Sequence, residues 1–154
     1  MTQATTEGGT RLIVPGLARI YETFSPYSYA FMRFCTGAVL FPHGWDKVFH
    51  GDMAKQAAGI AAHGVAMPML FAYAVTATEF FSAAFLAIGL FTRLAAATIW
   101  IEMAVISTVW LSANGYFWTN RGYEYALLWL LLCTAIFFRG GGRHSVDRLI
   151  GWEF

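Results

Sequence analysis

Long apolar stretches alternate with short polar breaks along most of the chain. Charged residues and helix breakers divide it into four apolar segments, which we place at residues 25–42, 67–91, 94–113 and 117–138. Each is close to the roughly 20 residues that a membrane-spanning helix needs. The break between the second and third segments is so short that these two must be antiparallel neighbours. The pattern therefore predicts an all-α integral membrane protein, a four-helix transmembrane bundle at residues 25–138.

The segments outside these stretches are more polar. Residues 1–24 end in a mixed apolar and charged stretch cut by Pro15-Gly16, which predicts a short interfacial N-terminal segment. The loop at residues 42–66 is long, and its part from 52 to 62 predicts a short helix that rests on the mouth of the bundle. A glycine run opens the tail at residues 139–154. We expect one domain with two flanking segments.

Composition supports a chain that faces lipid. Hydrophobic residues make up 58% and charged residues 12%, against about 45–50% and about 25% in soluble domains. The net charge is only +1, and no basic cluster suggests nucleic-acid binding. Cys35 and Cys133 lie far apart in apolar segments, and the histidine spacings match no metal site. We therefore expect a lipid bilayer as partner, no nucleic acid and no metal.

Basic residues are distributed unevenly between the two predicted sides. If four segments span the membrane, both termini share one side, and the loop at 42–66 faces the other. The side of the termini carries Arg11, Arg19, Arg93, Arg139, Arg143 and Arg148, whereas the other carries Lys47, Lys55 and Arg121. Because basic residues favour the cytoplasmic side, we expect cytoplasmic termini and an external loop.

Three ionisable residues lie well inside the predicted spans. Arg33 is in the first segment, Glu79 in the second and Glu102 in the third. Placing such residues in the hydrocarbon region costs free energy, and they usually face the interior of a bundle. Their compatible depths predict that the three meet in one cluster. Two interpretations stay open: a buried ion pair that fixes helix register, or a site for a lipophilic ligand with carbonyl or hydroxyl groups, of which quinone is the obvious example.

Several short motifs occur in an order typical of one family. They are Arg33 with Gly37, the run from Phe41 to Phe49 (FPHGWDKVF), Glu79, the run from Gly89 to Ala96 (GLFTRLAA), and the run from Gly140 to Asp147 (GGGRHSVD). Together they resemble the DoxX family of small bacterial membrane proteins over about residues 28–148. The resemblance implies a four-helix protein of the bacterial cytoplasmic (inner) membrane, related to the quinone-reducing subunit of thiosulfate oxidation. It places Arg33, Glu79 and Lys47 on the family's usual polar positions.

These observations lead to a functional hypothesis. We expect a quinone-interacting redox subunit in which Arg33 and Lys47 bind the quinone, while Glu79 and Glu102 relay protons. The sequence carries no cysteine pair, haem ligand or flavin motif, so a redox role would also require a protein partner in a membrane complex. The alternative is a non-catalytic accessory subunit that packs against a larger respiratory complex. A small transporter is disfavoured, because no predicted span carries a central Pro or Gly pattern that would unwind a helix for an ion site.

Overall fold

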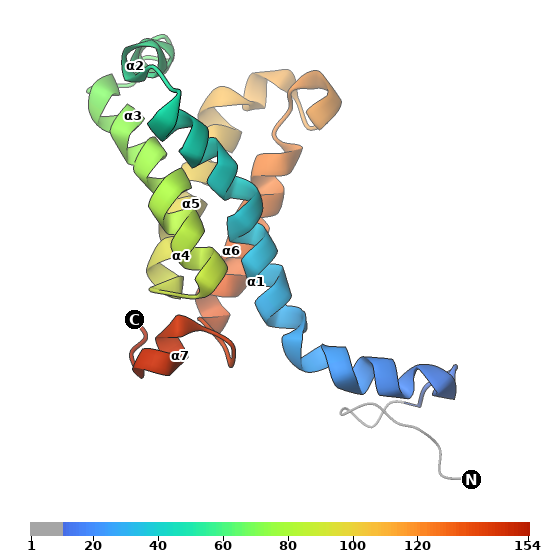
Figure 1. The fold of residues 1–154 in the computed structure, drawn as a ribbon. Helices are drawn as coiled ribbons and strands as arrows, with labels where there is room; N and C mark the ends of the chain where they lie inside the picture. Colours follow the sequence, from blue (N-terminus) through green and yellow to red (C-terminus); the bar gives the residue numbers. More distant parts are fainter. Residues whose placement is uncertain (1–10) are drawn as a thin grey trace.

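The regular elements of the chain are helices throughout the described part. A computed structural model describes residues 11–154, and the first ten residues of the predicted segment 1–24 lie outside it. After a short 3₁₀ turn, η1 (Pro15–Leu17), the elements run in the order α1 to α7 with π-helical and 3₁₀ segments between them. Figure 1 shows the long helices side by side, with α2 at one end and α7 at the other. The all-helical prediction is confirmed for these residues.

Helix α1 (Ala18–Phe49) is much longer than the predicted first segment at 25–42. Pro26 and Pro42 both lie inside it. An interior proline removes one backbone hydrogen bond and bends a helix, but it does not have to end the helix. The first turns of α1 run at a large angle to the rest of the helix (Figure 1). The continuation past Pro42 places Lys47 on the last turn of a helix, and not in a loop.

The second and third apolar segments form a helical hairpin. The first arm consists of α3 (Pro68–Ala77), the π-helical segment η2 (Thr78–Ser82) and α4 (Ala83–Ile88). The second consists of α5 (Thr92–Val105) and the π-helical segment η3 (Ile106–Trp110). Gly89 makes the turn between the arms with φ of 73°, in the left-handed region that glycine adopts freely. Within the described residues, these two arms are the helices long and apolar enough to cross a membrane.

The fourth helix, α6 (Glu124–Arg139), begins later than the predicted segment at 117–138. The residues before it form the 3₁₀ turns η4 (Ser112–Asn114) and η5 (Trp118–Asn120). Gly115, just after η4, has φ of 77°, and Arg121, just after η5, has φ of 60°, so the backbone has a positive φ after each turn. A helix cannot pass through such residues, and α6 therefore starts after them.

The predicted short helix in the long loop is α2 (Met53–Ala61). Asp52 caps its first turn by accepting hydrogen bonds from the backbone N–H groups of Ala54 and Lys55, at 2.9 and 3.1 Å. Its buried face, Ala57 and Ile60, packs on α3. This contact fixes α2 across one end of the bundle (Figure 1).

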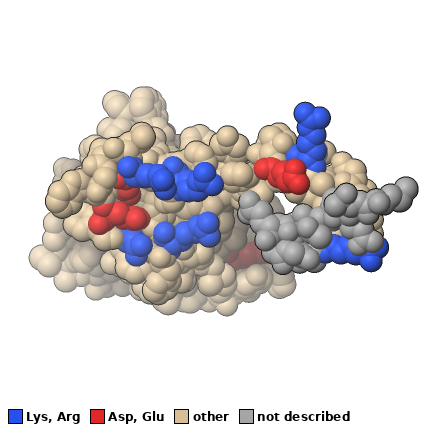
Figure 2. Space-filling view, turned by 90° about the horizontal axis from the view of Figure 1, so that it is seen from below, with Lys and Arg blue, Asp and Glu red and all other residues tan. Residues whose placement is uncertain are grey.

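The main core lies between α1, α4, α5 and α6. Its largest fully buried apolar side chains are Leu86, Ile99 and Ile136. The core is nearer the end that holds the α4–α5 turn and α7 (Val146–Ile150). Figure 2 looks at this end and shows basic side chains gathered on it, with acidic ones among them. The candidate site lies toward the end that carries α2, whose residues line its pocket.

Candidate functional site

Two glycines allow α1 to lie directly against the first arm of the hairpin. A Cβ atom on Gly37 would lie 2.3 Å from the backbone oxygen of Ala83, and one on Gly44 would lie 2.3 Å from the backbone nitrogen of Phe80. Such distances leave no room for a side chain, because the neighbouring atoms belong to the backbone. The glycines are seven residues apart and so share one face of the helix. Gly44 in particular brings the last turns of α1 onto η2.

This close approach places Lys47 beside Glu79. The Lys47 Nζ atom lies 2.5 Å from a carboxylate oxygen of Glu79. The lysine side chain is 29% exposed and that of the glutamate 8%, so the pair links the interior of the bundle to its surface. Glu79 itself lies in η2, where the wider π-helical turn interrupts the regular helix. Single π-helical turns of this kind often occur at functional sites.

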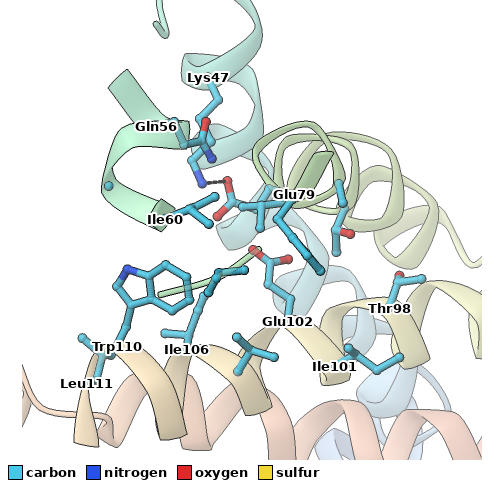
Figure 3. A pocket seen from close by; sticks show the side chains of 17 residues that line it. Lys47, Gln56, Ile60, Glu79, Thr98, Ile101, Glu102, Ile106, Trp110 and Leu111 are labelled. Carbon is cyan, nitrogen blue, oxygen red and sulfur yellow. Dashed lines mark ion pairs between the residues drawn. The ribbon is translucent and has the colours of Figure 1, made fainter. Parts of the chain in front are cut away.

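Glu102 approaches the same pair from the other arm of the hairpin. It lies on α5, one turn before η3 begins, and is 7% exposed. Figure 3 shows its carboxyl group pointing from α5 toward Glu79. Neither of its two oxygens accepts a hydrogen bond from residues 11–154. A buried carboxyl that accepts no hydrogen bond is costly for the fold and calls for an explanation.

The three side chains line one pocket between the two arms. Its cavity volume is about 700 Å³, within the range of about 300–1,000 Å³ that is usual for small-molecule sites. Besides Lys47, Glu79 and Glu102, its polar lining comes from the neutral side chains of Gln56, Thr78 and Thr98. The rest is apolar: Gly59, Ile60, Val65, Phe71, Ala74, Val75, Ile101, Val105, Ile106, Trp110 and Leu111. A few polar groups in an apolar cavity are suited to a lipophilic molecule with a polar end.

The structure does not bring Arg33 to this cluster. Its guanidinium group donates hydrogen bonds to the backbone oxygens of Leu86 and Ala87 at 2.6 and 2.8 Å, at the end of α4. A third bond, at 2.7 Å, reaches the backbone oxygen of His144 in the tail. The predicted meeting of Arg33 with the two glutamates is therefore wrong. The predicted depth of Arg33 in the membrane does not distinguish hydrogen bonding to backbone oxygens from an ion pair.

The glycine-rich motif after α6 is part of the same structural arrangement. The carboxylate of Asp147, on α7, accepts hydrogen bonds from the backbone N–H groups of Phe91 and Thr92 at 2.6 and 2.9 Å. It thereby satisfies the free N–H groups at the start of α5. The Tyr29 hydroxyl donates to the backbone oxygen of Gly140. These contacts hold the tail against the bundle and leave the pocket at the opposite end.

The sequence pattern predicts both glutamates as site residues but not the arrangement around them. The pattern places Lys47 in a loop and does not predict its ion pair with Glu79. The signal was present in the spacing, since Gly37, Gly44 and Lys47 follow one helical face once α1 is continued through Pro42. Trp110 and the α2 residues of the lining carry no sequence signal of their own. Within the described residues, no group of three or more His, Cys, Asp or Glu side chains could hold a metal ion.

Comparison with known proteins identifies the family. The sequence pattern of the DoxX family matches residues 28–112. A protein of Haemophilus influenzae, called only an uncharacterized protein, is 32% identical over 129 residues, which make up 82% of this chain and 92% of that protein. No solved structure matches the chain. The chain therefore belongs to the DoxX family of membrane proteins, and the resemblance inferred from the sequence motifs is confirmed.

Proposed function

We propose that this protein is a quinone-interacting subunit of the bacterial cytoplasmic membrane, with the quinone ring in the pocket between the hairpin arms. The observation that carries this proposal is Glu102, a buried carboxyl group that accepts no hydrogen bond from residues 11–154 and faces a largely apolar cavity. A quinone offers what this site lacks, because its ring suits the apolar walls and its carbonyl oxygens can pair with polar side chains. The residues present thus fit the ligand.

The charges of the site support different roles for the three side chains. One lysine faces two carboxyl groups, so Lys47 can compensate only one of them, and its partner is Glu79. Glu102 is then the group free to take up and release a proton, and in its protonated form it donates a hydrogen bond to a carbonyl oxygen. Lys47, with its side chain partly exposed, is the route by which Glu79 exchanges protons with water. Arg33 has no part in this scheme, since its two terminal nitrogens donate to backbone oxygens at the end of α4 and in the tail.

A redox function also requires a source of electrons. When bound, a quinone supplies the redox chemistry, because it becomes a quinol on taking up two electrons and two protons. The side chains of the pocket hold the ring and provide protons, and a partner protein in a membrane complex provides the electrons. The partner is part of the proposal.

The placement in the membrane is proposed together with the function. Helix α1, the two arms of the hairpin and α6 cross the bilayer as a four-helix bundle, with both termini in the cytoplasm. The asymmetry of basic residues supports this orientation, and Figure 2 shows basic side chains at the end of the termini. The end with α2 then faces outward, and the Lys47–Glu79 pair is close to that side. The rival is an accessory subunit whose buried carboxyls bind nothing.

Ligand binding by purified variants tests the proposal. Quenching of tryptophan fluorescence by decylubiquinone reports binding, because Trp110 lines the pocket. We expect saturable binding by the natural protein. The affinity should be about tenfold lower for Glu102→Leu, which corresponds to one lost hydrogen bond. Glu102→Gln should recover part of the affinity. The control is Glu22→Gln, which changes an exposed carboxylate on α1 far along the helix from the pocket. Absence of saturable binding, or equal affinities of Glu102→Leu and the natural protein, would contradict the proposal.

A further inference from the structure

The pocket opens to one side of the bundle, between the two arms of the hairpin. The arms meet at the Gly89 turn, where α4 packs on α5, and they diverge toward the end with α2, where α3 makes few contacts with α5. The exposed lining residues on these helices are Phe71 and Ala74 on α3 and Ile101 and Val105 on α5. All four are apolar. They lie on the two arms that are long and apolar enough to cross a membrane, so this opening faces the region where lipid chains would lie.

The end of the pocket toward water is covered by α2. Gln56, Gly59 and Ile60 of this helix all line the cavity. Ile60 is buried against α3, and the Thr76 hydroxyl donates a 3.4 Å hydrogen bond to the Gln56 side-chain oxygen. Figure 3 shows α2 lying over the site from the side of Lys47, opposite the α5 side chains. Helix α2 thus forms a roof that is attached to the bundle by apolar and polar contacts.

The polar and apolar parts of the pocket lie at different depths. Glu79 and Glu102 are buried, whereas the four apolar rim residues on α3 and α5 are exposed. The carboxyl groups therefore lie deeper in the pocket than the rim. A molecule with a polar ring and a long apolar chain fits this order only with the ring inward and the chain in the opening. In the reverse orientation, the chain would contact the carboxyl groups and the ring would lie in the lipid.

We propose that the pocket is loaded from the bilayer through the opening between α3 and α5, and that the chain of the bound molecule stays in this opening. The inference rests on the proposed function for the identity of the ring. It adds the route of entry and the orientation of the ligand. It also names a residue outside the polar site that determines the rate of entry, the small Ala74 at the rim. Helix α2 excludes water from the site and does not serve as its entrance.

Enlarging the rim tests this route. Ala74→Phe places a large apolar side chain at the opening, whereas Ala77→Phe makes the same change on an exposed position of the same helix outside the pocket lining. Both positions are exposed, so neither change overpacks the core. The proteins are reconstituted in lipid nanodiscs, and decylubiquinone supplied in a second population of nanodiscs is followed by stopped-flow quenching of tryptophan fluorescence.

We expect association with Ala74→Phe to be at least about tenfold slower than with the natural protein, equivalent to about 1.4 kcal/mol in the barrier. Ala77→Phe should associate at the natural rate. If Ala74→Phe associates as fast as Ala77→Phe while the natural protein binds normally, the lateral route is wrong and the proposed function stands. If the natural protein does not bind the quinone at all, the proposed function fails, and the route fails with it.

Discussion

Replacing Glu102 with leucine should stabilise the ligand-free protein. Neither buried oxygen of this carboxyl group accepts a hydrogen bond from the described residues, and a buried polar group without its hydrogen bonds costs about 1–3 kcal/mol in protein mutational data. Leucine has a similar size and suits the apolar walls of the pocket. We therefore expect the free energy of unfolding to rise by about 1–3 kcal/mol. For a chain of this length, each kcal/mol raises the midpoint of thermal unfolding by about 2–4 °C.

The assay requires protein without quinone, because a bound ligand would stabilise the natural protein and hide the effect. The proteins are prepared from cells that make no quinone, and thermal unfolding in detergent is followed by circular dichroism. The matched control is Glu79→Leu, which leaves Lys47 without its partner at 2.5 Å. Because the lysine is partly hydrated, the expected loss is about 1–2 kcal/mol, less than for a fully buried pair. If Glu102→Leu lowers stability as Glu79→Leu does, Glu102 has a structural role and the reasoning is refuted.

Close helix packing, the tail and the orientation each provide a further test. Gly44→Ala should lower the free energy of unfolding by about 1–3 kcal/mol, because its Cβ would lie 2.3 Å from a backbone nitrogen of η2. The control is Gly59→Ala, which has nothing within 4 Å of the added atom and should leave the free energy of unfolding equal or raise it by up to about 1 kcal/mol. Equal losses of stability in the two variants would contradict the packing argument. Asp147→Ala removes two hydrogen bonds to a charged group and should lower stability by about 2 kcal/mol or more; hydrogen exchange at the start of α5 should accelerate, and unchanged exchange would count against this role. In intact cells, an impermeant thiol reagent should label Lys55→Cys and not Arg143→Cys, and the reverse pattern would overturn the orientation.

The periodicity of the chain predicts the helices well and their ends poorly. Apolar length alone places the hairpin arms close to their observed positions, at 68–88 and 92–110. It fails at Pro42, because a proline usually indicates the end of a helix. Here α1 continues to Phe49, with Gly44 packed on η2. It also starts the fourth helix too early, because hydropathy does not register the positive φ at Gly115 and Arg121.

The site shows a similar limit. The cost of burying a carboxyl group in a membrane is a property of the residue, so Glu79 and Glu102 stand out in the sequence. Which cation they meet depends on helix rotation and close packing. Arg33 has a compatible depth but lies where the backbone oxygens of α4 end, and it binds those instead. The pocket arises from the divergence of α3 and α5, which no local pattern encodes.

The most direct test of the central claim is organic extraction of the protein purified in mild detergent from quinone-containing membranes, with the extracted quinone quantified by chromatography. A quinone bound at the Glu102 pocket predicts a stoichiometric amount in the natural protein and in Glu22→Gln, and a large loss in Glu102→Leu. Extracts without quinone from the natural protein, or the same amount from Glu102→Leu as from the natural protein, would contradict the account.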